Sequence, residues 1–370
     1  EVVFAGDYSK LKGKDTLTAK YLDEVERIEI PTTRRKWNNK VSLIGARQHN
    51  LKGIDVDIPL NTLTVVTGVS GSGKTSLVKG ILYPAVLRET QQYSTQRIGE
   101  VKEIKGDFSS FSAVELVDQN PIGKSSRSNP VTYVKAYDAI RELFSTMPIA
   151  KQRGFKTKHF SFNVDGGRCD NCQGEGEEVV EMQFMADLHL TCEECNGKKF
   201  KEEVLEVEFK QKSIYDVLNL TVEEAVDFFR GQKTIVNKLL PLQEVGLGYV
   251  KLGQSSNSLS GGEAQRIKLA TFLGKSQNKD KVLFIFDEPT TGLHFHDIKK
   301  LLKSFNALID KGHSVVVIEH NLDVVKCADW VIDLGPEGGD RGGELMFAGT
   351  PEDLAKSKKS VTGQFLKEKM

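Results

Sequence analysis

The sequence lacks any apolar run long enough to cross a membrane. Its longest apolar stretches, "VLFIF" at 282–286 and "VVVI" at 315–318, have the length of buried strands. The sequence also lacks an excess of either charge, because 51 Lys and Arg residues balance 51 Asp and Glu residues. No overall field draws the chain toward nucleic acid or lipid, so a polyanion could be bound only by a local patch. We therefore predict no membrane partner.

Cysteine is scarce as well. Only five cysteines occur in 370 residues, and four of them form two CxxC pairs. This pattern fits a reducing compartment and a metal site better than a disulfide framework, so we predict a soluble, cytoplasmic protein. The length allows two or three compact units with cores of their own.

A phosphate-binding loop is present near residue 70. The strand-like run "LTVVTG" leads into "GVSGSGKTS" at 68–76, a full G-x-x-x-x-G-K-[ST] match. The glycines let backbone amides curl around phosphate oxygens, Lys74 adds a charge at the β- and γ-phosphates, and Thr75 offers a hydroxyl to Mg²⁺. A glycine-rich turn without a nucleotide is the alternative, and the complete Lys-Thr ending argues against it. The predicted ATP-binding residues of the loop are Gly68, Ser70, Gly71, Gly73, Lys74, Thr75 and Ser76.

Two later segments carry chemistry that suits such a loop. "LFIFDEP" at 283–289 predicts a buried strand that ends in Asp287, for the Mg²⁺ shell, and Glu288, which would polarise the attacking water. "VVVIEH" at 315–320 predicts a second buried strand that ends at His320, the position of a γ-phosphate sensor. Each segment alone could be a strand end without chemistry.

A third segment, "LSGGEAQR" at 259–266, predicts a helix start. Ser260 and Glu263 have the spacing of a capping box, and a helix cap without chemistry is the plain alternative. The order of phosphate loop, "VDQNPIG", "LSGGE", "FDEP" and "IEH" nevertheless resembles the ATP-binding cassette (ABC) ATPases. In that family two cassettes sandwich ATP, and the signature of one faces the phosphate loop of the other. The resemblance implies that Gln119 acts with Glu288 and His320, and that Ser260, Gly261, Gly262 and Glu263 contact ATP.

The four paired cysteines predict a zinc site. Cys169-x₂-Cys172 and Cys192-x₂-Cys195 are separated by nineteen residues, a spacing that suits tetrahedral Zn²⁺. Gly174 and Gly197 follow the pairs and would allow the positive φ of a metal knuckle. Between the pairs, residues 179–190 alternate as in a β-hairpin, with Val180, Met182, Phe184, Ala186 and Leu188 on one side. A redox dithiol or free thiols remain alternatives, and CxxCxGxG also marks the zinc modules of DnaJ-type chaperones.

Local positive charge gathers before the cysteines. Residues 122–130 and 150–162 are loop-like, with Phe155, Phe160 and Phe162 interleaved among the basic side chains. An ordinary solvated face is the alternative to a DNA-binding surface. The candidate DNA-contacting residues are Lys124, Arg127, Arg153, Lys156 and Lys158.

As a whole, the sequence resembles the UvrA family, the damage-recognition ATPases of bacterial nucleotide excision repair. The segments that carry this resemblance include "GARQHNLKGIDVDIP", "DQNPIGKSSRSNPVTY", "FSFNVDGGRCDNCQGEG", "DEPTTGLHFHD" and "DLGPEGGDRGGE". The family implies ATP, Mg²⁺ and Zn²⁺ as cofactors and damaged double-stranded DNA as ligand. It also implies a homodimer, and a UvrB-type partner that binds through a half absent from this sequence.

An internal repeat suggests how the chain is organised. "EVVFAG" at 1–6 matches "ELMFAG" at 344–349, and "LTAKYLDE" at 17–24 matches "VTGQFLKE" at 361–368. We predict that 1–24 is the tail of a preceding homologous cassette and 25–39 a linker. An α/β ATP-binding lobe would comprise 40–118 and 280–370. A mainly helical signature domain would span 119–279 and carry the zinc-bound β-hairpin module at 166–200.

Three other functions compete with excision repair. A transporter cassette predicts a short connection from Gln119 to the signature and no cysteine insert, which this sequence contradicts. A non-catalytic zinc scaffold does not explain Lys74, Asp287 and Glu288. A UvrA-like paralogue that acts in drug tolerance has the same motifs, so the sequence alone does not exclude it.

Overall fold

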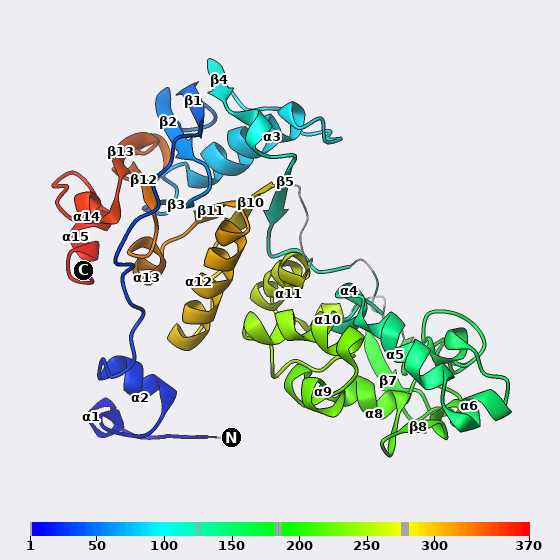
Figure 1. Ribbon diagram of the computed structural model, residues 1–370. Helices are drawn as coiled ribbons and strands as arrows, with labels where there is room; N and C mark the ends of the chain where they lie inside the picture. Colours follow the sequence, from blue (N-terminus) through cyan, green and yellow to red (C-terminus); the bar gives the residue numbers. More distant parts are fainter. Residues whose placement is uncertain are drawn as a thin grey trace. The chain divides into compact units, whose positions relative to one another are not determined.

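The computed structural model describes residues 2–370 except 124, 126, 181, 183, 185–186 and 275–280 (Figure 1). The chain forms two compact units, which are described separately below. Unit 1 comprises residues 1–119 and 275–370, and unit 2 comprises residues 120–274. Among the described residues, no helix combines the length and the apolar character needed to cross a membrane.

A six-stranded mixed sheet forms the centre of unit 1. Its strands, in spatial order, are β13 (Glu344–Gly349), β12 (Trp330–Gly335), β3 (Leu63–Gly68), β11 (Ser314–Ile318), β10 (Val282–Asp287) and β5 (Ala113–Val117). The last five are mutually parallel, and β13 pairs antiparallel with β12. Every residue of β3 and β11 is buried, as expected for strands covered on both faces. The predicted α/β class is confirmed.

A smaller antiparallel sheet completes the core of unit 1. It has the order β2 (Ile54–Pro59), β1 (Lys40–Ala46) and β4 (Glu103–Gly106). Apolar residues of both sheets and of the helical segment after the phosphate loop form one buried cluster, which includes Leu43, Leu77 and Ile318. The phosphate loop is therefore anchored at both of its ends in the same core.

Helices and helical turns connect the strands of unit 1. They are α1 (Tyr8–Leu11), α2 (Leu17–Leu22), η1 (Ser76–Leu82), α3 (Tyr83–Glu89), η2 (Phe108–Ser110), α12 (Phe295–Asp310), α13 (Leu322–Val325), η5 (Gly339–Arg341), α14 (Pro351–Leu354) and α15 (Val361–Leu366). The repeated segments share a local device: Thr16 Oγ1 caps α2 through the Ala19 amide, and Ser360 Oγ caps α15 through the Gly363 amide. That residues 1–24 end a preceding cassette stays a prediction.

Unit 2 is mainly helical. Its elements are α4 (Pro130–Tyr133), α5 (Ala136–Ser145), α6 (Pro148–Gln152), η3 (Thr157–Phe160), β6 (Glu177–Val180), β7 (Leu188–Thr191), α7 (Glu202–Leu205), β8 (Glu208–Phe209), β9 (Lys212–Ser213), α8 (Ile214–Asn219), α9 (Val222–Phe228), α10 (Lys233–Glu244), η4 (Ser256–Ser258) and α11 (Gly261–Gly274). Helix α10 packs against α5, α9 and α11. Strands β6 and β7 form an antiparallel hairpin.

Candidate functional site

The phosphate loop joins the end of β3 to a continuous helical segment. Gly68, Gly71 and Gly73 all have positive φ, at 127°, 74° and 101°. A Cβ on Gly68 would lie 2.0 Å from the Leu334 carbonyl oxygen, so only glycine fits this close approach. The expected helix does follow, but its first turns are a π-helix, η1, before α3 begins.

Lys74 is held inside this loop by backbone carbonyls. Its Nζ donates hydrogen bonds to the oxygens of Gly68, at 3.1 Å, and Val69, at 2.8 Å. Burial lowers the pKa of Lys74, and the charges of Glu288 and Asp333 oppose that shift. Thr75, which carries the hydroxyl predicted to bind Mg²⁺, is exposed, and so are Ser70 and Gly71. The loop therefore offers its donors toward solvent while the lysine charge stays satisfied.

The predicted carboxylates, Asp287 and Glu288, lie at the same edge of the sheet as the phosphate loop. Asp287 ends β10 and pairs in register with Ile318, the last residue of β11. Because the two strands are parallel, the residues after them meet, and the Glu288 amide donates to the Ile318 carbonyl at 2.9 Å. Glu288 adopts a left-handed conformation, with φ of 47°, directly after the strand. Gln119 is exposed and lies two residues beyond β5, the other neighbour of β10.

His320 approaches Glu288 closely. Its Nε2 lies 3.7 Å from Glu288 Oε1, and its ring also interacts with the Gly68 backbone. Burial and then the Lys74 charge lower the pKa of His320, although Glu288 and Glu319 oppose them. The ring is therefore neutral near pH 7. Unit 1 thus brings together the phosphate loop, Asp287, Glu288 and His320.

The signature segment lies in unit 2, at the start of α11. The Ser260 amide donates to Glu263 Oε2 at 2.8 Å, and the Glu263 amide donates to Ser260 Oγ at 3.3 Å. This is the predicted capping box. Tyr249 adds a third contact, because its hydroxyl lies 2.6 Å from Glu263 Oε1. Gly261 and Gly262 begin the helix, so their backbone amides have no acceptor within the helix.

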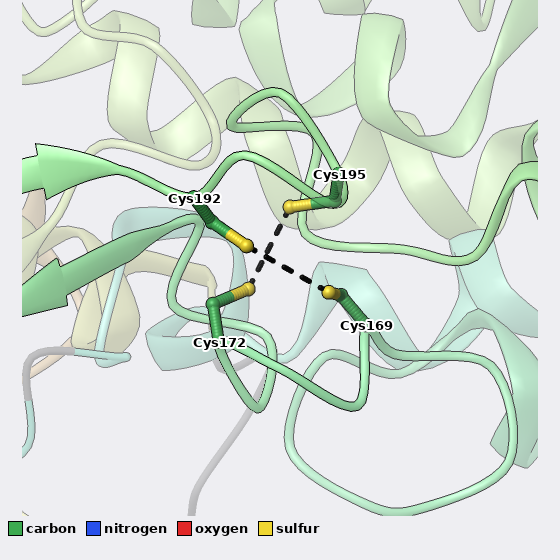
Figure 2. A group of neighbouring side chains, drawn as sticks. All are labelled: Cys169, Cys172, Cys192 and Cys195. Carbon is green, nitrogen blue, oxygen red and sulfur yellow. Dashed lines mark hydrogen bonds between the residues drawn. The ribbon is translucent and has the colours of Figure 1, made fainter.

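Figure 2 shows the four paired cysteines converging from two turns of unit 2. Their Sγ atoms all lie within 4.8 Å of one another, and each residue is at most 8% exposed. The Cys169–Cys192 and Cys172–Cys195 sulfur distances are 3.9 and 3.6 Å. Zn–S bonds of about 2.3 Å in a tetrahedron require sulfurs about 3.8 Å apart, so the arrangement fits a zinc ion.

Hydrogen-bond donors surround these sulfurs. The Gly176 amide donates to Cys172 Sγ at 3.2 Å, and Gly174 and Gly197 have the expected positive φ. For Cys192, burial is outweighed by hydrogen bonds from the Cys195 backbone and from the Asn171 side chain, whose Nδ2 donates to Cys192 Sγ, so its pKa is lowered to about 7. Burial raises the pKa of Cys169 to about 12. A bound cation would stabilise all four thiolates.

The hairpin between the two pairs is solvated. Val180, Met182, Phe184 and Leu188 are exposed, and Ala186 lies outside the described residues. The first pair of the ladder, Glu177 with Thr191, lies directly beside the cysteine cluster. The cluster therefore closes the open end of the hairpin.

The basic stretch divides into paired and exposed residues. Arg127 Nε lies 2.7 Å from Glu175 Oε1, and Arg153 pairs with the Glu206 carboxylate. Lys156 and Lys158 are exposed, whereas Lys124 lies outside the described residues. Two of the three interleaved aromatic residues, Phe160 and Phe162, are buried in the core of unit 2. These two rings are therefore not part of an exposed DNA-binding surface.

Several contacts at the nucleotide edge were not anticipated from the sequence. Lys79 Nζ forms an ion pair with Asp287. Glu319 accepts hydrogen bonds from the segment that follows β10 and from the segment that follows β11. Asn50 Nδ2 donates to the carbonyls of Gly71 and Gly339, each at 2.9 Å. The density of glycines in "GPEGGDRGGE" was the available signal for this last contact, since backbone there must pass close to the phosphate loop.

The sheet order, the phosphate loop and the carboxylates at the strand ends define unit 1 as a P-loop α/β fold. No family model matches the chain. Individual proteins do match it. The chain is 50% identical over 370 residues to UvrABC system protein A of Clostridium perfringens, covering 100% of the chain and 39% of that protein. It is also 50% identical to UvrABC system protein A of Aquifex aeolicus, covering 99% of the chain and 40% of that protein.

A solved structure agrees with these sequence matches. The crystal structure of UvrA2 from Deinococcus radiodurans matches with a TM-score of 0.89 and 42% identity, over 100% of this chain and 44% of that one. The predicted resemblance to UvrA is confirmed, and it extends along the whole chain. The chain spans about two fifths of the length of the curated relatives that it matches.

Proposed function

We propose that this chain is an ATP-binding and ATP-hydrolysing part of a UvrA-type protein of nucleotide excision repair. The observation that carries the proposal is the approach of His320 Nε2 to within 3.7 Å of Glu288 Oε1, beside the phosphate loop. This geometry occurs in a chain that is 50% identical to UvrABC system protein A over its whole length. The sequence identity supports the assignment to the UvrA family, and the residues at this edge of the sheet support ATP hydrolysis.

The residues of unit 1 divide the work of hydrolysis. Lys74 would exchange its two backbone carbonyls for phosphate oxygens, so no buried charge is left unpaired at any stage. Glu288 would orient the attacking water and accept its proton. His320, neutral because burial lowers its pKa, would hydrogen-bond the γ-phosphate from its place between Glu288 and Gly68. Asp287 and Thr75 would hold Mg²⁺, which neutralises the phosphate charge.

The remaining predicted nucleotide residues need a second cassette. We propose that Ser260, Gly261, Gly262 and Glu263 contact ATP held by another phosphate loop, and that Gln119 senses the bound nucleotide. The open amides at the start of α11 support this role, because they suit an anion. A homodimer and a UvrB-type partner that binds outside this chain complete the proposal.

Unit 2 would contribute zinc and DNA binding. The four cysteines would hold a structural Zn²⁺, which fixes the base of the β6–β7 hairpin. Exposed Lys156 and Lys158 would contact DNA phosphates, together with Lys124. Arg127 and Arg153 would first have to leave Glu175 and Glu206. Phosphate contacts of this kind suit recognition of distorted DNA, because they carry no base sequence.

The nucleotide role can be tested on the chain itself with Lys74→Met and Glu288→Gln. Lys74→Met should weaken ATP binding, measured with a fluorescent analogue. Glu288→Gln should keep binding but lower turnover by roughly 10²–10⁴-fold, because it removes the base. Turnover is measured at high protein concentration, so that two copies can pair. Wild-type turnover by Glu288→Gln would refute the assigned role.

The DNA role needs a matched charge control. Lys156→Ala/Lys158→Ala should lower the slope of log affinity against log salt by about two for both lesion-bearing and intact duplexes. Lys358→Ala/Lys359→Ala removes the same charge from exposed residues of unit 1 and should leave the slope unchanged. Equal effects of the two double variants would show that the basic stretch is only a solvated face.

A further inference from the structure

A buried carboxylate lies between the two catalytic candidates. Glu319 directly follows β11 and precedes His320, and it is only 3% exposed. Acidic side chains are rarely buried unless every oxygen is satisfied. The function proposed above gives this residue no role.

Four donors satisfy Glu319, two on each oxygen. Oε1 accepts from the Thr290 amide at 2.9 Å and from the Thr290 hydroxyl at 2.5 Å. Oε2 accepts from the amides of His320, at 2.8 Å, and Asn321, at 2.9 Å. All four donors are uncharged. Because the Thr290 segment and the His320–Asn321 segment both donate to this one carboxylate, its position sets the position of each segment.

These donors belong to the two segments that carry catalysis. Thr290 lies two residues after Glu288, whose amide is bonded to the Ile318 carbonyl at 2.9 Å. Glu288 also holds a left-handed φ of 47°, a conformation that costs free energy in a residue other than glycine. A contact just beyond Glu288 is therefore needed to keep the turn in place. The Glu319–Thr290 pair supplies it.

We propose that Glu319 is a positioning residue that fixes the distance between Glu288 and His320. One oxygen holds the turn after Glu288 and the other holds the backbone of His320, so the carboxylate works as a rigid spacer between them. The inference rests on the proposed hydrolysis of ATP. It adds a residue that acts on the reaction only through the positions of Glu288 and His320.

Glu319→Gln is the sharpest test. Glutamine keeps the shape but offers one carbonyl oxygen, and its NH₂ group faces two N–H or O–H donors that lose their acceptor. The value of kcat should fall by at least about tenfold, because small misplacement of catalytic groups is costly. The KM for ATP should change by less than about threefold, because the phosphate loop is intact. Thr290→Val removes only the hydroxyl and should produce a smaller loss in kcat of the same kind.

Asp329→Asn is the matched control. Asp329 is also a buried carboxylate of unit 1, but it bonds Arg35 and the Leu63 amide at the amino end of β3, away from the phosphate loop. Asp329→Asn should lower the melting temperature and leave kcat unchanged. If Glu319→Gln behaves in the same way, Glu319 is a structural residue and the proposal is wrong.

Hydrogen exchange separates this proposal from the proposed function. In Glu319→Gln without nucleotide, peptides that cover 288–292 and 319–322 should lose protection together, whereas they should not do so in Asp329→Asn. If the wild-type chain does not hydrolyse ATP, joint loss still supports the spacer while the proposed function fails. Loss in only one of the two peptides would overturn the spacer, whatever the wild-type activity.

Discussion

Lys79 Nζ lies 2.5 Å from Asp287 Oδ2, so a cation of the protein already contacts the carboxylate assigned to Mg²⁺. Lys79 belongs to η1, directly after the phosphate loop, and the two side chains are 28% and 23% exposed. A divalent cation held by Asp287 must therefore compete with this ammonium group.

Lys79→Met should tighten the binding of Mg²⁺. An ion pair at a partly exposed site contributes about 0.2–1 kcal/mol, so the Mg²⁺ concentration that half-saturates ATP binding should fall by roughly 1.5–5-fold. Mg²⁺ titration with a fluorescent ATP analogue measures it, and Lys303→Met, on the exposed face of α12, is the control. Weaker binding of Mg²⁺ in Lys79→Met would instead mean that Lys79 helps to hold the nucleotide.

Cys172→Ser should abolish metal binding and destabilise unit 2. Loss of about 2 kcal/mol would lower the melting temperature of a domain of this size by roughly 4–8 °C. Metal content by mass spectrometry should drop from one zinc per chain to none, and a chelator should have the same effect on the wild type. Cys327→Ser is the control, because Cys327 lies outside the cluster. Equal zinc content in the two variants would exclude the four-cysteine site.

Gly68→Ala should be among the most damaging substitutions in unit 1. The new Cβ would lie 2.0 Å from the Leu334 carbonyl oxygen at a φ of 127°, so the sheet must shift, at a cost of at least about 3 kcal/mol. Gly292→Ala, with φ of 73° and no atom within 4 Å, should cost only about 1–2 kcal/mol. Urea unfolding measures both. Similar losses of unfolding free energy in the two variants would mean that backbone strain, and not the contact with Leu334, dominates the cost.

Stability should fall as the pH drops below neutrality, and His313 should contribute to this loss. Burial lowers the pKa of His313 below its ordinary value of 6.5, and its Nδ1 accepts from the Val282 amide at 3.1 Å. The unfolded chain then binds the proton more readily than the folded chain. The free energy of unfolding therefore decreases as pH falls from just above 6.5 through the folded pKa. His313→Asn, which keeps an acceptor, should flatten this dependence in urea unfolding at pH 5–8, and an unchanged slope would contradict the assignment.

The sequence alone predicts residues whose role depends on near neighbours. Lys74 follows from the glycine spacing of one loop, and Asp287 from an apolar run that ends in a carboxylate. The cysteine site also depends on spacing within two short turns. In each case a short motif marks the residue type and its spacing, although Asp287 and the two cysteine turns reach their partners only through strand pairing and the fold of unit 2.

Residues whose partners are distant in sequence were not predictable in this way. The pairing of Arg127 with Glu175 depends on how unit 2 folds, so a basic stretch cannot show which of its charges are already paired. Glu319 looks like any strand-end residue until Thr290 is brought beside it by the parallel pairing of β10 and β11. The burial of Phe160 likewise follows from packing against Phe144 and from the hydrogen bond that the Tyr137 hydroxyl donates to the Phe160 carbonyl, not from its place in a basic run.

The insertion of unit 2 between β5 and β10 has a mechanical consequence. The chain leaves the sheet at the carboxyl end of β5 and returns at the amino end of β10, and these parallel strands are hydrogen-bonded neighbours. If these two connections were drawn apart, β5 would be pulled from its carboxyl end and β10 from its amino end, so the strands would be loaded along their length in opposite directions. Their hydrogen bonds share such a load in shear instead of opening one after another. Separation of the two connections would thus load β5 together with the strand that ends in Asp287.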